Sequence, residues 1–253
     1  MKPVHLFFLI VVLLNSFSLT AQKEERHDIV LLDNVNFDRV DKNLELTRLA
    51  DKVWLIQSSY ACNGHLDCNH LLIVDRKDIV LVNTPASDSL TAILLNCIEK
   101  KFKRKVTKVI VSHFHDDSSG GLIVIGKRGI RSYASNMTRD LLKPGNKSID
   151  FVFTDSLNIP LQTIPLKLYY FGAGHSIDNI VIWLSAGKIL FGGCLMKSLD
   201  STDNGNIKDA DLQAWPVTVQ KVKDRFRDVQ TVIPGHGMIG DASVFDHTIE
   251  ILK

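Results

Sequence analysis

The chain has 253 residues, which is enough for one large domain with a substantial core. Hydrophobic residues make up 45% of it and charged residues 23%, and the formal net charge is +2. This composition is typical of a soluble globular protein, and it lacks the basic excess of a nucleic-acid-binding protein. We therefore expect no nucleic-acid partner.

The first 21 residues have the pattern of a secretory signal peptide. A short basic start, MKPVH, precedes the apolar run LFFLIVVLLNSF, and small residues follow up to Ala21, the expected cleavage position. A membrane anchor is the alternative, but the run is shorter than the roughly 20 residues that a span needs. We predict a mature domain of residues 22–253 that is exported to the periplasm without a stable membrane anchor and acts as a monomer.

The first half of the mature chain passes from antiparallel strands to alternating strands and helices. After an extended N-terminal region, the expected elements are strands over 52–59, 70–76 and 78–85, a helix over 87–102, a strand over 107–112, a helix over 120–129, a strand over 130–134 and a helix over 135–143.

The second half repeats this plan of strands first and helices after. Its expected elements are strands over 151–161, 164–172, 179–185 and 188–193, a helix over 211–226, a strand over 231–237 and a short helix after Asp241. This order predicts two sheets packed together, with helices outside and a site between the sheets.

The segment VSHFHDDSSGGL follows one of these strands. Side chains two apart on an extended chain point to the same side, so His113 and His115 can face one cation, and Asp117 can reach a neighbouring site. Imidazole and carboxylate groups at this spacing suit zinc. A lone His-x-His is most often a chance surface pair, but the continuation into aspartate and Gly-Gly is more specific.

Three further metal-binding side chains stand at predicted strand ends among glycines, which let the backbone approach a crowded centre. They are His175 in FGAGHSIDN, Cys194 in FGGC and His236 in IPGHG. Each alone is weak evidence, but the four segments together indicate a metal centre.

These segments resemble the class B zinc β-lactamases of the first subclass. The resemblance runs from about Leu44 through nearly all of the mature chain, and it is carried by HFHDDSSGGL, GAGHSIDNIVIWL, ILFGGCLMK, GNIKDADLQAWP and VIPGHG. It implies an α/β fold of the αββα type, a four-layer sandwich of two mixed sheets face to face with helices outside. It also implies two zinc ions at the sheet edges.

The resemblance implies a role for each matching residue. The implied ligands are His113, His115 and His175 for the first zinc, and Asp117, Cys194 and His236 for the second. Lys197 would pair with the substrate carboxylate, and Asn206 would hold or polarise the lactam carbonyl. Asp117 would also orient the attacking water and move its proton. The implied activity is hydrolysis of the β-lactam amide bond in penicillins, cephalosporins and carbapenems, which confers antibiotic resistance.

Two features depart from the family pattern. Asn83 stands where the family usually has an aspartate that supports the zinc ligands. The segment ACNGHLDC occupies the position of the family's mobile flap, where we favour a disulfide between Cys62 and Cys68 over two free thiols and expect Leu66 at the apolar tip. Cys97, on a predicted helix, is expected to be a buried small hydrophobic residue.

Two other functions remain open from the residues alone. One is another exported hydrolase of the same fold, acting on thioesters, lactones or phosphodiesters, although such dinuclear enzymes usually read HxHxDH and here Ser118 follows Asp117. The other is a non-catalytic zinc-binding protein of the cell envelope. Lys197 and Asn206 favour catalysis over storage, since a storage site needs no substrate anchors.

Overall fold

The computed structural model describes residues 37–145 and 147–253. The predicted signal peptide and its cleavage position lie outside these described residues. Within them, no helix combines the length and the apolar character that crossing a membrane requires.

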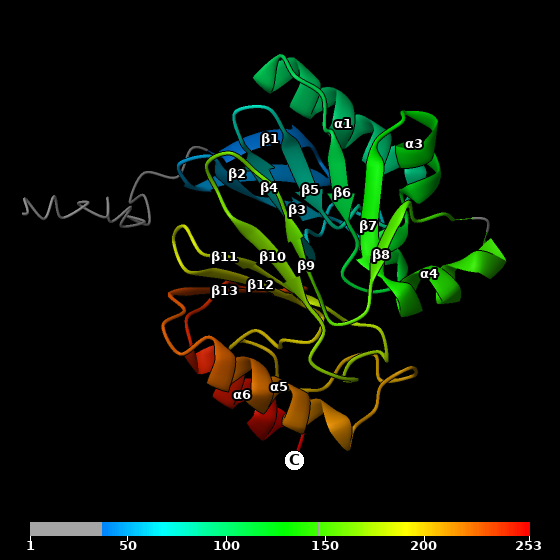
Figure 1. Cartoon of the computed structure of the whole chain (residues 1–253). Coiled ribbons are helices and arrows are strands. Elements are labelled where there is room, and N and C mark those ends of the chain that lie inside the picture. The colour runs from blue at the N-terminus through cyan, green and yellow to red at the C-terminus, as the bar shows by residue number, and fades with distance from the viewer. Residues whose placement is uncertain (1–36, 146) are drawn as a thin grey trace, which may run out of the picture.

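Two β-sheets face each other at the centre of the molecule (Figure 1). The first sheet has eight strands in chain order: β1 (Phe37–Asp41), β2 (Leu44–Ala50), β3 (Val53–Ser58), β4 (Cys68–Val74), β5 (Ile79–Val82), β6 (Lys108–Ile110), β7 (Arg131–Ser135) and β8 (Phe151–Phe153). Strands β1 to β5 pair antiparallel, and β5 to β8 pair parallel. This sheet is therefore mixed, as predicted.

The second sheet has five strands and is also mixed. Its order is β13 (Thr231–Pro234), β12 (Ile189–Gly193), β11 (Val181–Leu184), β10 (Leu166–Tyr169) and β9 (Ser156–Ile159). Only β12 and β13 pair parallel. As a result, both strands reach the same edge of the sheet at their carboxyl ends, where Cys194 and His236 follow.

Helices cover the outer face of each sheet (Figure 1). On the first sheet they are α1 (Asp88–Phe102), α3 (Leu122–Lys127) and α4 (Asn136–Leu142); α5 (Ala214–Arg225) and α6 (Ser243–Ile251) cover the second. Three hydrophobic cores separate the layers, one between the sheets and one under each set of helices. The predicted αββα sandwich is thereby confirmed.

The central strands contain runs of consecutive apolar residues, such as Leu71 to Val74 of β4, because they are buried on both faces. On β4, Leu71 and Ile73 belong to the core between the sheets, whereas Leu72 packs with Leu90 and Leu94 of α1. A strand buried on both faces carries hydrophobic side chains on both, so alternation disappears.

One predicted strand is divided into two in the structure. Residues 151–161 were expected to form one strand, but they form β8 in the first sheet and β9 in the second. The chain bends between them, because β8 pairs with β7 while β9 pairs with β10. This segment therefore carries the chain from one sheet to the other.

Candidate metal centre

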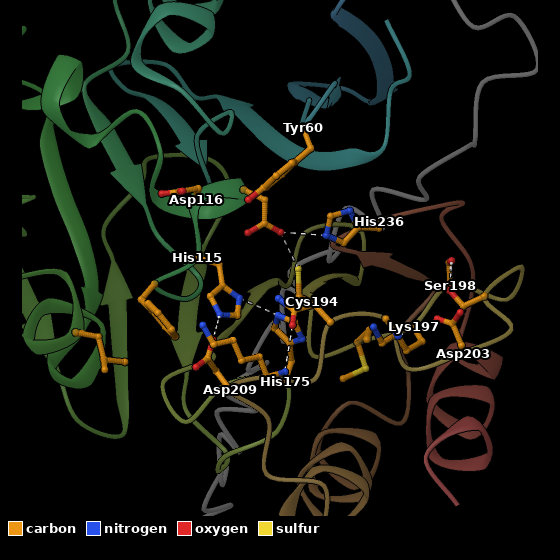
Figure 2. A pocket seen from close by; sticks show the side chains of 18 of the residues that line it. Tyr60, His115, Asp116, His175, Cys194, Lys197, Ser198, Asp203, Asp209 and His236 are labelled. Carbon is orange, nitrogen blue, oxygen red and sulfur yellow. Dashed lines mark hydrogen bonds and ion pairs between the residues drawn. The ribbon is translucent and has the colours of Figure 1, made fainter. Parts of the chain in front are cut away.

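The six candidate metal ligands predicted from the sequence come together at one edge of the two sheets. Figure 2 shows four of them, His115, His175, Cys194 and His236, around the cavity. They follow β6, β12 and β13 or precede β11. Local structure differs from the prediction at one point, since the alternation stops at His115 and a four-residue helix, α2 (Asp116–Ser119), begins. Asp117 therefore reaches the cluster from a helical turn rather than from an extended chain.

Three histidines form the first group. One ring nitrogen from each of His113, His115 and His175 lies within 4.8 Å of the other two. His115 Nδ1 is 3.1 Å from His175 Nε2, while His115 Nε2 is 2.9 Å from the carboxylate of Asp209. Asp209 was not predicted, although it stands in GNIKDADLQAWP. A carboxylate on the far nitrogen of a ligating imidazole holds the ring in one orientation.

Asp117 joins the second group. Its Oδ2 atom is 3.2 Å from Cys194 Sγ and 3.0 Å from His236 Nε2. Its Oδ1 atom lies 3.4 Å from His113 Nε2, so the two groups adjoin. His236 Nδ1 is 2.7 Å from the backbone carbonyl of Asp67, which orients this ring as well.

The protonation states of these side chains are strongly shifted. Burial lowers the pKa of His175 to about 2, and the nearby His113 and His115 add to the effect. Burial raises the pKa of Cys194 to about 12, so the thiol keeps its proton in the metal-free protein, and a metal that binds there has to displace it. Burial alone would raise the pKa of Asp117, but His113 and the hydrogen bond from His236 hold it far below its usual range. His175 is therefore neutral, as a metal ligand must be.

Close packing around the cluster explains two of the glycines. A Cβ atom at Gly235 would collide with Cys194 Sγ, and one at Gly120 would collide with the backbone of Ala86. Both positions thus require glycine because another chain segment lies directly against the backbone.

Comparison with known proteins identifies the family. Residues 63–236, a range that includes all six side chains, match the metallo-beta-lactamase superfamily. A relative from Bacteroides fragilis, named metallo-beta-lactamase type 2, is 38% identical over 218 residues, covering 85% of this chain and 88% of the relative. The chain belongs to the metallo-β-lactamase superfamily.

Other members of the superfamily agree in sequence and in structure. The metallo-beta-lactamase type 2 of Bacillus cereus is 35% identical over 212 residues, covering 83% of both chains. The structure of a metallo-beta-lactamase from Pontibacter korlensis superposes with a TM-score of 0.79 at 33% identity, covering 83% of this chain and 98% of that one. The resemblance to class B metallo-β-lactamases is confirmed.

All of the candidate metal ligands except His113 line a cavity of about 770 Å³. Lys197 and Asn206, the predicted substrate anchors, both line it. The ammonium group of Lys197 lies 5.3 Å from the centre of the Trp215 ring, and burial lowers its pKa. The side-chain oxygen of Asn206 accepts a hydrogen bond from the backbone N–H of Lys208 at 3.1 Å. This contact turns the amide NH₂ of Asn206 away from Lys208.

The flap differs from the prediction in three residues. Cys62 and Cys68 are both free thiols, so the expected disulfide was wrong. Cys68 is buried at the start of β4, whereas Cys62 is exposed in the loop at a φ of 53°. Leu66, expected at the apolar tip, does not line the cavity; Tyr60, immediately before this segment, does (Figure 2). Cys97, expected to be buried, is only half-buried on α1.

Asn83 supports the loop that carries the histidines. Its side-chain oxygen accepts hydrogen bonds from Ser112 N at 2.8 Å and from Ser118 Oγ at 2.6 Å, and Asn83 is 2% exposed. Its φ of 61° lies in the left-handed region, which asparagine tolerates better than most residues. The neutral side chain of Asn83 thus accepts both hydrogen bonds through its amide oxygen, and one of the two donors is the hydroxyl of Ser118.

We predict that Asn83→Ala destabilises the protein by about 2–4 kcal/mol, because two buried donors, Ser112 N–H and the Ser118 hydroxyl, lose the Asn83 oxygen and alanine is strained at positive φ. Urea unfolding in the presence of a chelator measures this without a metal contribution. Asn83→Gly keeps the backbone conformation and separates the hydrogen bonds from the strain. Asn96→Ala, at an exposed site on α1, serves as the control. An Asn83→Ala protein as stable as this control would show that the contacts contribute nothing.

Proposed function

We propose that this protein hydrolyses the amide bond of β-lactams with two zinc ions, and thereby confers antibiotic resistance. One observation carries the proposal: a single cavity combines Lys197 with five of the six proposed metal ligands, and the sixth, His113, lies directly behind them, 3.4 Å from Asp117 Oδ1. The names of the relatives from Bacteroides fragilis and Bacillus cereus support it. We propose that penicillins, cephalosporins and carbapenems are all substrates.

The donor atoms of the six proposed ligands are of the kinds that zinc prefers. Three imidazoles with room for one further ligand are typical of a catalytic zinc, and thiolate, imidazole and carboxylate suit a second ion. His113 Nε2 and Asp117 Oδ1 are buried and have no hydrogen-bond partner among the described residues, and coordination to bound metal would satisfy the lone pairs of both atoms. Zinc, when bound, polarises a carbonyl oxygen and lowers the pKa of water to about 7.

Asp117 is proposed to move the proton. Its Oδ2 atom is engaged by Cys194 and His236, which leaves Oδ1 to hold the attacking water. Because the pKa of Asp117 lies far below its usual range, the carboxylate is ionised and is a weak base, so Oδ1 holds the proton only in passing. The same oxygen can then deliver the proton toward the amide nitrogen that leaves.

Lys197 and Asn206 are proposed to position the substrate. A lysine ammonium group is a strong partner for the carboxylate that β-lactams carry beside the scissile amide. The free NH₂ of Asn206 can donate a hydrogen bond to the lactam carbonyl, whose oxygen gains negative charge during attack. Both contacts fix the reacting bond relative to Asp117.

The test is hydrolysis of a chromogenic cephalosporin and a carbapenem by the purified protein, before and after chelation and after zinc is returned. We expect ring opening that chelation abolishes and zinc restores. Binding of two zinc ions without any ring opening would reject the proposed reaction, and thioesters and lactones would then be assayed.

We further propose that the protein acts as a monomer in the periplasm. The proposal of export is based on residues 1–21. N-terminal sequencing of the protein recovered from the periplasm should begin at Gln22, and sedimentation should give the mass of one chain.

A further inference from the structure

The cavity carries charged groups on two opposite sides of the metal-binding cluster. Lys197 lies on one side and Asp116 on the other, with His115 and Cys194 between them (Figure 2). Lys197 is the proposed anchor for the substrate carboxylate. Asp116 stands between two of the metal-binding residues in sequence but has no role so far.

Asp116 is paired with a lysine from a different segment. Lys147 Nζ lies 2.7 Å from Asp116 Oδ1 and 3.4 Å from Ser119 Oγ, so this lysine links the loop after α4 to α2. Exposure of the pair is unequal, since the side chain of Asp116 is 57% exposed and that of Lys147 only 16%. A molecule in the cavity therefore meets the carboxylate before the ammonium group.

The cavity that holds this pair is lined in part by apolar side chains. Phe114, Leu141 and Leu142 line the same cavity. A charged group that binds there leaves part of its water shell, so the sign of the charge it meets has more effect than on an open surface. This part of the cavity can therefore discriminate between substituents by their charge.

We propose that the Asp116–Lys147 pair selects β-lactams by the charge on their acylamino side chain. This inference rests on the proposed function. In a penicillin, the ring carboxylate and the acylamino group lie on opposite sides of the scissile amide. With the carboxylate at Lys197 and the amide at the metal-binding cluster, the acylamino group extends toward Asp116. The exposed carboxylate of Asp116 favours an ammonium substituent there and disfavours a second carboxylate.

The test uses three penicillins that differ only at the α carbon of the acyl group: benzylpenicillin, its α-amino derivative and its α-carboxy derivative. The measured quantity is the ratio of kcat/KM for the amino derivative to that for the carboxy derivative. Because both rates come from one preparation, the ratio does not depend on how much of a variant is correctly folded. We expect it to exceed 1 in the unsubstituted protein, with the difference mainly in KM.

The two members of the pair should shift the ratio in opposite directions. Asp116→Asn removes the carboxylate and frees Lys147, so the ratio should fall about fivefold, the size of effect that an exposed charge pair can contribute. Lys147→Met leaves Asp116 uncompensated, so the ratio should rise by about the same factor. A general loss of activity without a change in the ratio would overturn the proposal.

Asp140 offers a matched control. It is an aspartate on α4 that pairs with Lys143 at 2.8 Å and does not line the cavity. Asp140→Asn should leave the ratio as it is in the unsubstituted protein, and an equal shift in this variant would reject a local effect of Asp116. If the unsubstituted protein hydrolyses none of the three penicillins, the proposed function fails together with this inference. Hydrolysis with an unshifted ratio in both cavity variants rejects the inference alone.

Discussion

Cys194→Ser is expected to lower kcat/KM for β-lactams by about 100-fold or more, which corresponds to about 2.7 kcal/mol of lost transition-state stabilisation. A serine hydroxyl keeps its proton at neutral pH and is a poorer zinc ligand than a thiolate. The carboxylate of Asp117 would also lose its contact with Cys194 Sγ at 3.2 Å. Metal analysis after dialysis should find close to one zinc per chain in the variant and close to two in the unsubstituted protein.

Cys97 provides the control for this experiment. It is a half-buried free thiol on α1 and lies outside the cavity. Cys97→Ser should keep both the zinc content and the turnover of the unsubstituted protein. If Cys194→Ser behaves in the same way, Cys194 does not bind a metal and the assignment of the second site is wrong.

Lys197→Ala is expected to raise KM by about 10–100-fold, because a hydrogen bond between charged groups contributes about 1.5–3 kcal/mol. The effect falls on KM rather than kcat where substrate binding is close to equilibrium, since the carboxylate is held equally in the ground state and the transition state. Lys197→Arg keeps the charge and should recover part of the affinity. Lys221→Ala, at an exposed position on α5, is the control, and a KM equal to that of this control would remove Lys197 from the site.

The pH dependence of KM gives a second readout for Lys197. Burial lowers the pKa of this lysine below its ordinary value of 10.5, so the ammonium group deprotonates at a lower pH than that of a free lysine. Lys197 carries its positive charge below this lowered pKa, and the charge that holds the substrate carboxylate is lost as the pH rises through the pKa. KM should therefore rise in alkaline solution in the unsubstituted protein, and this rise should be absent in Lys197→Ala.

Local sequence patterns were sufficient to predict most secondary structure. Helix α1 was predicted over 87–102 and lies at Asp88–Phe102, where Ser87 caps its first turn and the apolar face is buried. Such elements follow from capping and periodicity within one segment. The chain between 151 and 161 was harder, because pairing with two different sheets divides a run that looks like one strand.

The candidate site was predictable in its residue types and not in its geometry. Histidine, cysteine and aspartate next to strand ends indicated the candidate metal ligands, and the structure brings these side chains together. The sequence could not show that Asp117 reaches the cluster from α2, or that Tyr60 lines the cavity in place of Leu66. Both depend on how a loop turns.

By itself, the sequence determined most of the order of strands and helices, the family and the candidate metal ligands, because each depends on a short segment with its own chemistry. Only the tertiary structure decided that Cys62 and Cys68 stay apart, that Asp209 contacts His115 and that Lys147 pairs with Asp116. The last two contacts join residues 94 and 31 positions apart in the chain. Packing of the two sheets and their loops creates these contacts, and no local pattern encodes them.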